Sequence, residues 1–316
     1  MTVTTEKLAA EPDPTNIPSV ASDAHKRLSS PWASLAAAII AIVWTVPTAG
    51  LLISSFRPQY DVKTTGWWEF FVHPHLTISN YQAVLQGSSG ESATNLGSFL
   101  VNSIVIVIPA VIIPIFLATM AAYGFAWTRF WGRDFIFVMV FALQIVPIQV
   151  TVIPLLRLFV HPPLGLPAIS GNDALAGGLY SLWLAHAMFG LPLAIFLLHN
   201  FMTQIPGELI ESARVDGAGH VQIFTRIILP LMTPAIAAFG ILQFLWVWND
   251  LFVAMVFAGH DNAPITKALS DLTGDRGQEW PLLSAGAFVS MVIPMIVFLS
   301  LQRFFVRGLL AGSVKG

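Results

Sequence analysis

Polar and aromatic side chains that could bind a sugar lie together in one otherwise apolar stretch of the sequence. Trp246, Trp248, Asn249 and Asp250 follow a long run without charged residues. An indole ring can stack on the apolar face of a pyranose, and amide and carboxylate groups can pair with its hydroxyls. The stretch therefore predicts a candidate sugar path. The alternative is that Asn249 and Asp250 only cap or lock packed helices.

A second group of residues, in the polar segment 204–226, is typical of a protein–protein contact. Pro206 and Glu208 can open a short helix, because proline suits the first helical turn and a carboxylate suits its positive end. Gly217 then permits a tight turn into a second helix. The small residues of this segment would let another protein's backbone approach closely; they are Ser212, Ala213, Gly217, Ala218 and Gly219.

The motifs of several enzyme classes are absent from the sequence. Without a Gly-Lys pair there is no phosphate-binding loop of the form Gly-x-x-x-x-Gly-Lys-Ser/Thr, and there is no His-Glu-x-x-His helix or Gly-x-Ser-x-Gly turn. The cysteine count is 0, which excludes disulfides and thiolate ligands. His73 and His75, at i,i+2 spacing, are weak evidence for a metal. We expect no catalytic residue, no metal site and no cofactor bound by this chain.

The composition places these residues in a membrane protein. Hydrophobic residues make up 55% of the chain and charged residues 10%, whereas soluble domains carry about 25% charged residues. The net charge of −2 gives no electrostatic reason to bind nucleic acid. A helix needs about 20 apolar residues to cross a bilayer. Six charge-free runs are long enough, at 32–56, 92–128, 135–156, 174–207, 227–249 and 280–302.

The sequence thus predicts an all-α membrane protein with six transmembrane helices. Cytoplasmic loops retain Lys and Arg, which sets the orientation. With both termini in the cytoplasm, ten of the 15 Lys and Arg residues lie inside: Lys7, Lys26, Arg27, Arg129, Arg133, Arg214, Arg226, Arg303, Arg307 and Lys315. We expect residues 1–30 to form a polar, disordered N-terminus, residues 31–307 the six-helix domain, and residues 308–316 a cytoplasmic tail.

Prolines recur inside the predicted spans. They are Pro47, Pro109, Pro114, Pro147, Pro154, Pro192, Pro234 and Pro294. In lipid, a break in a helix persists only where neighbouring groups or cavity water satisfy the freed carbonyls. These positions predict kinked helices around a polar path. The alternative is that proline is simply commoner in membrane helices.

The spacing of residues in segment 204–226 resembles a known motif. The segment is similar to the Glu-Ala-Ala loop of permease subunits in binding-protein-dependent ABC importers. Its pattern is Glu211-Ser212-Ala213, a gap of three residues, Gly217, a gap of nine residues, and then Ile227-x-Leu229-Pro230. The single departure is Ser212 in place of the usual alanine. The resemblance implies the type I ABC importer permease fold and a coupling helix seated in an ATPase subunit. The coupling residues that it implies are Glu208, Glu211, Ser212, Ala213, Asp216, Gly217, Ala218, Gly219, Ile227, Leu229 and Pro230.

Four further stretches narrow the resemblance. The second permease of maltose-type carbohydrate importers is resembled by Trp248-Asn249-Asp250 and by the ending 301–316. The α-glucoside branch of that family is resembled by 273–277 and 280–283. This implies a multi-pass protein of a bacterial or archaeal plasma membrane, forming half of a path for an α-linked di- or oligosaccharide. It also implies a tail that contacts the ATPase through Gly308, Ala311, Gly312, Ser313, Val314, Lys315 and Gly316.

The same resemblance implies a set of partners. These are a second homologous permease, two copies of an ATPase that bind ATP and Mg, an extracytoplasmic sugar-binding protein, the sugar and membrane lipid. We expect the polar outer loop 259–279 to contact the sugar-binding protein. An ion-coupled secondary sugar carrier is the alternative, and it would have only Asp250 as an acidic coupling group in a span. A membrane-embedded enzyme would need convergent catalytic groups, which the spans lack.

Overall fold

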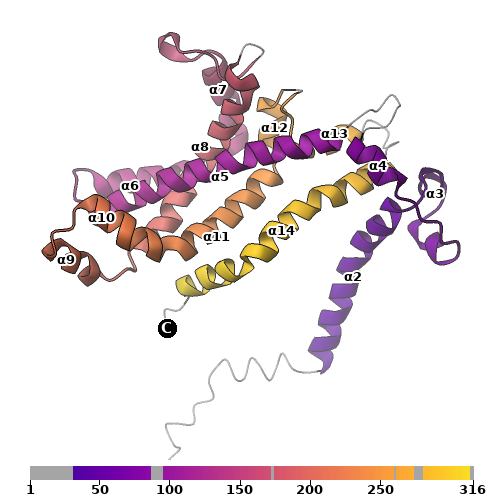
Figure 1. Ribbon diagram of the computed structural model, residues 1–316, viewed down its shortest axis with the longest axis horizontal. Helices are drawn as coiled ribbons and strands as arrows, with labels where there is room; N and C mark the ends of the chain where they lie inside the picture. Colours follow the sequence, from indigo (N-terminus) through magenta and orange to yellow (C-terminus); the bar gives the residue numbers. More distant parts are fainter. Residues whose placement is uncertain (1–30, 87–94, 172–173, 260, 274–279, 314–316) are drawn as a thin grey trace, which may run out of the picture. The chain divides into compact units, whose positions relative to one another are not determined.

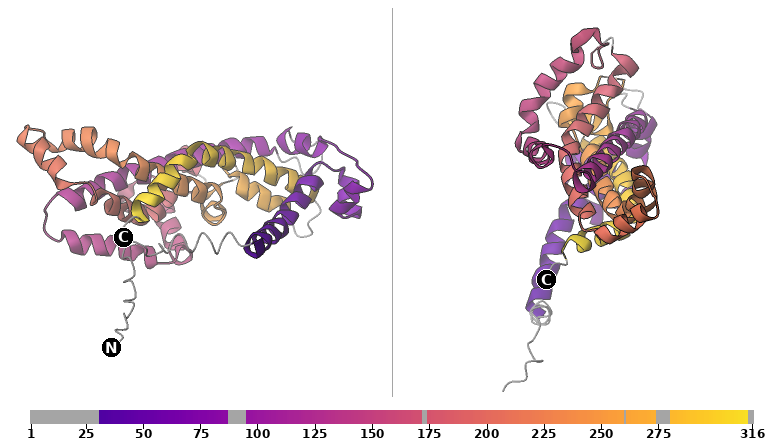
Figure 2. Two further views of the ribbon diagram at one scale, coloured as in Figure 1. Left: turned by 90° about the horizontal axis from the view of Figure 1, so that it is seen from below. Right: turned by 90° about the vertical axis from the view of Figure 1, so that its left-hand side faces the viewer.

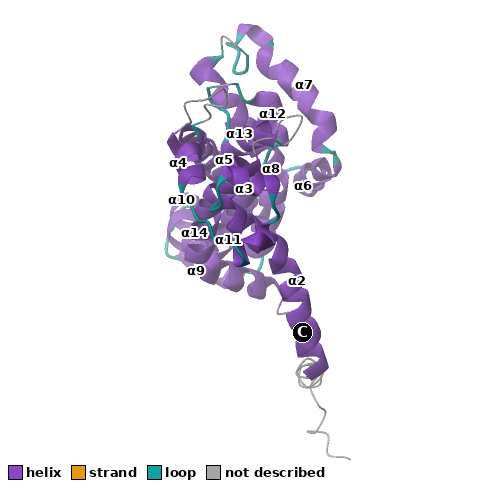
Figure 3. Ribbon diagram, turned by 90° about the vertical axis from the view of Figure 1, so that its right-hand side faces the viewer, coloured by secondary structure: helices purple, strands orange, loops and turns teal. Residues whose placement is uncertain are grey.

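The computed structural model describes residues 31–86, 95–171, 174–259, 261–273 and 280–313. Within these ranges it contains helices and loops and no strand (Figure 3). The chain divides into two units, 1–53 and 54–316. The described part of the first unit, 31–53, belongs to helix α2 (Pro31–Ser55), whose 25 apolar and small residues are enough to cross a bilayer.

Four long apolar helices form the body of the second unit. They are α5 (Leu96–Trp127), α8 (Leu179–Met202), α11 (Leu229–Trp248) and α14 (Trp280–Ser313). Helix α5 packs along α8, and α11 contacts α5, α8 and α14 (Figure 1). Together with α2 they make five helices that are long and apolar enough to span a membrane.

The remaining predicted span, at 135–156, is bent rather than straight. Helix α6 (Arg133–Ala142) and the turn η2 (Leu143–Ile145) meet α7 (Ile148–Val160) at an angle of 104°. Pro147 causes the break, because it has no N–H to continue the helix and forces the preceding residue into an extended conformation. Pro109, Pro114, Pro192, Pro234 and Pro294 instead lie within continuous helices. The six-span prediction is confirmed when the bent pair counts as one span.

Shorter elements lie at the two ends of the second unit. At one end are α3 (Gln59–Thr64), η1 (Trp67–Phe71), α4 (Ser79–Gln86) and α13 (Ile265–Thr273). At the other end are α9 (Gly207–Val215), α10 (His220–Ile223), the π-turn η5 (Phe224–Ile228) and the connection from α5 to α6 (Figures 1 and 2). Helix α12 (Phe252–Phe257) follows α11, and the turns η3 (Pro163–Gly165) and η4 (Leu175–Gly178) connect α7 to α8.

Three clusters of buried apolar side chains hold the helices of the second unit together, in its middle and at both ends. One cluster joins α5, α8 and α11 to the short helices 207–223, and it includes Leu198, Ile210, Ile223 and Met232. A second joins α5, α7, α8, α11 and α12, and it includes Leu182, Trp248 and Phe257. A third joins α4 and α13 to α5 and α14 through Val84, Leu96 and Ala285. Segment 207–223 is therefore anchored to the spanning helices.

Three expectations fall wholly or partly outside the described residues. These are the N-terminus 1–30, positions 274–279 of the outer loop and the last residues 314–316. The expected tail 308–316 begins within α14, which continues as one helix through Ser313.

Candidate functional site

Segment 204–226 folds as a helix, a turn and a second helix. Helix α9 begins directly after Pro206. Its C-terminus is closed by two hydrogen bonds, in which the N–H of Ala218 donates to the carbonyl of Ala213 (2.9 Å) and the N–H of Gly217 donates to that of Arg214 (3.0 Å). Gly217 has φ +83°. These two hydrogen bonds, around a residue in the left-handed conformation, form the Schellman motif at the end of the helix. The motif favours glycine at the left-handed position.

One face of α9 is anchored and the other is open. Ile210 and Ala213 are buried in the first cluster. Glu208, Glu211 and Ser212 are exposed. Helix α9 thus presents its two acidic residues, Glu208 and Glu211, away from the core, and its apolar side holds it to the spans. Ala213, although part of the motif, lies on the anchored side.

Helices α9 and α10 also expose apolar residues that the motif did not single out. Leu209 is 45% exposed, Val215 87% and Val221 76%. Exposed apolar side chains at the polar end of a membrane protein are typical of an interface with another protein. The signal in the sequence is weak, because an apolar residue in a short helix is usually buried.

The second half of the coupling motif leads into α11. Asp216 and Gly219 are exposed and Ala218 is half-buried. Ile227 is half-buried, whereas Leu229 and Pro230 are exposed. A π-turn over Phe224–Ile228 joins α10 to α11, and such turns occur often at functional sites.

A contact between α5 and α10 ties this segment to a spanning helix. The hydroxyl of Tyr123 lies 2.9 Å from Nδ1 of His220, within hydrogen-bonding distance. The Tyr123 ring also meets the Phe224 ring edge to face, with centroids 5.2 Å apart. Sequence reasoning missed Tyr123 and His220, because they are far apart in the chain and only the fold brings them together.

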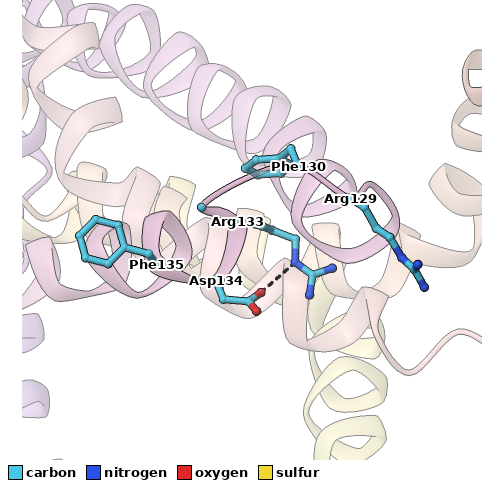
Figure 4. Close-up of a pocket in the computed structure, with 6 residues that line it drawn as sticks. Arg129, Phe130, Arg133, Asp134 and Phe135 are labelled. Carbon is cyan, nitrogen blue, oxygen red and sulfur yellow. Dashed lines mark hydrogen bonds and ion pairs between the residues drawn. The ribbon is translucent and has the colours of Figure 1, made fainter.

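The connection from α5 to α6 forms a polar surface at the same end of the unit. Nε of Arg133 donates to Oδ1 of Asp134 at 2.8 Å, and Arg129 and Phe130 lie beside this pair (Figure 4). A shallow cavity of about 370 Å³ is lined by these residues and Phe135. This end of the unit therefore carries exposed Glu208 and Glu211 of α9 together with Arg129 and Arg133.

A larger cavity lies beside the bent span. Its volume is about 960 Å³, and it is lined by the break between α6 and α7, by α8, by the end of α11 and by α12. Small-molecule sites usually have volumes of about 300–1,000 Å³ with mostly apolar walls and few polar groups. The polar side chains that line this cavity are Gln144, Gln149, Thr151, His186, Gln243 and Asp250.

The cavity brings together two of the four residues of the candidate sugar path. Trp246 and Asp250 line it. Trp248 is instead buried in the second cluster, where its Nε1 donates to the carbonyl of Ser290 (3.2 Å). Nδ2 of Asn249 donates back to the carbonyl of Leu245 (2.8 Å). Neither Trp248 nor Asn249 lines the cavity.

Asp250 has a structural role as well as a place in the cavity wall. Its Oδ2 accepts a hydrogen bond from the N–H of Ala254 in the first turn of α12 (3.2 Å). Its backbone carbonyl accepts one from Oγ1 of Thr266 (2.7 Å). This hydrogen bond to the start of α12 fits the capping alternative considered for this residue, and Asp250 also lines the cavity.

Sequence reasoning missed every polar side chain of the cavity wall except Asp250, and His186 and Gln243 are two of those missed. Nε2 of Gln243 donates to the carbonyls of Ala110 (3.3 Å) and His186 (3.4 Å), which joins α11 to α5 and α8. Gly190 leaves room for this side chain, since a Cβ there would lie 2.6 Å from Oε1 of Gln243. The only signal in the sequence is a polar residue in an apolar span.

Comparison with known proteins places this arrangement among transport proteins. Residues 110–311 match the family described as the binding-protein-dependent transport system inner membrane component. The chain is 51% identical over 282 residues to the osmoprotective compounds uptake permease protein GgtD of Synechocystis sp., covering 87% of this chain and 89% of that protein. It is 49% identical over 245 residues to the alpha-glucoside transport system permease protein AglG of Rhizobium meliloti, covering 77% and 61% respectively.

A solved structure shares the fold. A chain of the bacterial alginate ABC transporter in complex with alginate pentasaccharide-bound periplasmic protein aligns with a TM-score of 0.62 at 18% identity, covering 89% of this chain and 96% of that one.

Proposed function

Since the chain belongs to the family of binding-protein-dependent transport system inner membrane components, we propose that it forms half of the translocation path of an ATP-driven sugar importer. It is a multi-pass membrane permease. The observation that carries the proposal is the cavity of about 960 Å³ beside the bent span, with Trp246 and Asp250 in its wall. An indole and a carboxylate in a mostly apolar wall suit a sugar ring and its hydroxyls.

We infer that the substrate is an α-linked di- or oligosaccharide. The support is the 49% identity with a permease named for alpha-glucoside transport and the 51% identity with one named for osmoprotective compounds. No residue of this chain is given a catalytic role. The chemistry of the cycle is ATP hydrolysis, and we assign it to a separate ATPase that binds ATP and Mg.

Coupling to that ATPase is assigned to segment 204–226. The exposed face of α9, with Glu208, Glu211 and Leu209, would seat in the ATPase, and the buried Ile210 would carry its movement to the spans. Because α9 is packed into the same cluster as α5, α8 and α11, a displacement of α9 moves these helices with it. The spans then alternate between inward and outward opening of the cavity.

The remaining partners follow from this mechanism. A second homologous permease would complete the path, and the extension of α14 beyond Arg307 would contact the ATPase dimer with both chain termini in the cytoplasm. An extracytoplasmic sugar-binding protein would deliver the sugar, as the periplasmic protein in the alginate transporter complex binds an alginate pentasaccharide. We assign its contact to the outer loop 259–279, whose base is held where Nδ2 of Asn102 donates to the carbonyls of Asp261 (2.9 Å) and Ala263 (3.1 Å).

The test is purification and reconstitution of the chain with the products of its neighbouring transport genes. We expect an ATPase to copurify, and sugar uptake into proteoliposomes to require both ATP and the binding protein. Uptake that follows an ion gradient without ATP would refute the proposal and favour the secondary carrier.

A further inference from the structure

His186 and Asp250 face each other across a gap in the wall of the large cavity. Nε2 of His186, on α8, lies 3.9 Å from Oδ2 of Asp250, which follows α11. That separation is too long for a hydrogen bond between the two groups. The side chains are 9% and 19% exposed respectively, so both are largely removed from solvent. Two polar groups in a mostly apolar wall are thus held close together without bonding each other.

Both residues of this pair are anchored to neighbouring segments. Asp250 is fixed from the far side, because its Oδ2 also accepts from the N–H of Ala254 and its backbone carbonyl accepts from Thr266. The backbone of His186 is fixed by Gln243, whose Nε2 reaches its carbonyl. Gln243 also reaches the carbonyl of Ala110, so the backbone that carries His186 is tied to both α11 and α5.

A hydroxyl group satisfies both sides of such a gap. An oxygen atom can lie about 2.8 Å from Nε2 and Oδ2 at once when these are 3.9 Å apart. A hydroxyl both donates and accepts, so it can donate to the carboxylate and accept from an imidazole N–H. Trp246 in the same cavity offers an apolar ring surface for stacking.

We propose that His186 and Asp250 together bind one hydroxyl of the transported sugar, so that this chain contacts the substrate directly and contributes to its selection. The inference rests on the proposed function and deepens it. It adds His186, which the sequence did not indicate, and assigns Asp250 a partner. Trp248 and Asn249 have no part in the site, because neither lines the cavity.

The test pairs single-hydroxyl changes in the sugar with changes in the protein. The assembled importer is reconstituted as wild type, Asp250→Asn and His186→Gln, with a saturating concentration of sugar-loaded binding protein. Initial uptake is measured for whichever of maltose, trehalose and sucrose is carried best, and for its monodeoxy analogues. The binding protein is the same for every variant, so its own preference cancels when variants are compared.

We expect one deoxy position to reduce wild-type uptake about tenfold or more, the range for a hydrogen bond to a charged group. In Asp250→Asn and His186→Gln, removing the same hydroxyl from the sugar should cause little or no further loss of uptake. Asp61→Asn is the matched control, because Asp61 forms a His–carboxylate pair with His75 (3.3 Å) outside the cavity. This control should keep the wild-type pattern of penalties.

A purely structural role would lower the uptake of all analogues by the same factor. The same deoxy penalties in wild type, Asp250→Asn and His186→Gln would therefore overturn the inference while leaving the proposed function intact. Failure of the wild-type importer to carry any of the three sugars would instead overturn the proposed function, and the inference with it.

Discussion

Replacing Gly217 tests the coupling segment at the point where its backbone is most constrained. Gly217 has φ +83°, and an added Cβ would meet nothing within 4 Å. A larger residue would therefore not clash, and its cost comes from the left-handed backbone alone. For a β-branched residue this strain is about 1–3 kcal/mol. A strain of about 2 kcal/mol corresponds to roughly a 30-fold change in an equilibrium constant.

We expect Gly217→Val to insert in the membrane at normal levels, because the turn is exposed and lies outside the buried clusters. The strain should open the Schellman motif and disorder the open face of α9. Sugar uptake and the amount of ATPase recovered with the purified chain should then fall by about tenfold or more. Both quantities are normalised to the permease found in the membrane.

Two variants separate backbone strain from side-chain bulk. Gly217→Asn should retain much more uptake than Gly217→Val, since asparagine tolerates the left-handed region. Gly207→Val places the same side chain at the start of α9, where a Cβ also meets nothing within 4 Å and φ lies outside the left-handed range. It should behave nearly as wild type. Normal uptake by Gly217→Val, or equal losses for valine at both positions, would refute this reasoning.

Three further changes test the coupling face, the cavity wall and the end of α14. Glu211→Lys should reach the membrane but retain less ATPase, because the side chain is exposed on the open face of α9; unchanged retention in pull-downs would argue against a contact there. Gly190→Ala should destabilise the protein by about 1–3 kcal/mol, since its Cβ would lie 2.6 Å from Oε1 of Gln243. Thermal unfolding in detergent should then show that the double variant Gly190→Ala/Gln243→Ala loses less stability than the sum of the losses in the two single variants. Additive losses would contradict this contact. A chain ending at Arg307 should lose ATPase retention and uptake, whereas wild-type transport by that chain would indicate a frayed terminus.

The sequence alone identified the spans and the turn at Gly217. Charge-free runs of more than 20 residues have few stable forms other than membrane helices, so their number could be predicted. Gly217 could be placed because a turn at that point requires a backbone conformation that glycine adopts most readily. Both signals are local, and both are governed by the residue types themselves.

Tertiary structure decided which residues line the cavity. Helix α11 is apolar nearly all round, so its periodicity does not show which face meets the core. Packing against α14 turns Trp248 inward and leaves Trp246 in the cavity wall. His186 meets Asp250 because α8 and α11 pack together. Likewise, of the prolines within the described spans only Pro147 interrupts its span sharply, since the others are accommodated within continuous helices. These outcomes depend on which helices are neighbours, and a linear pattern does not contain that information.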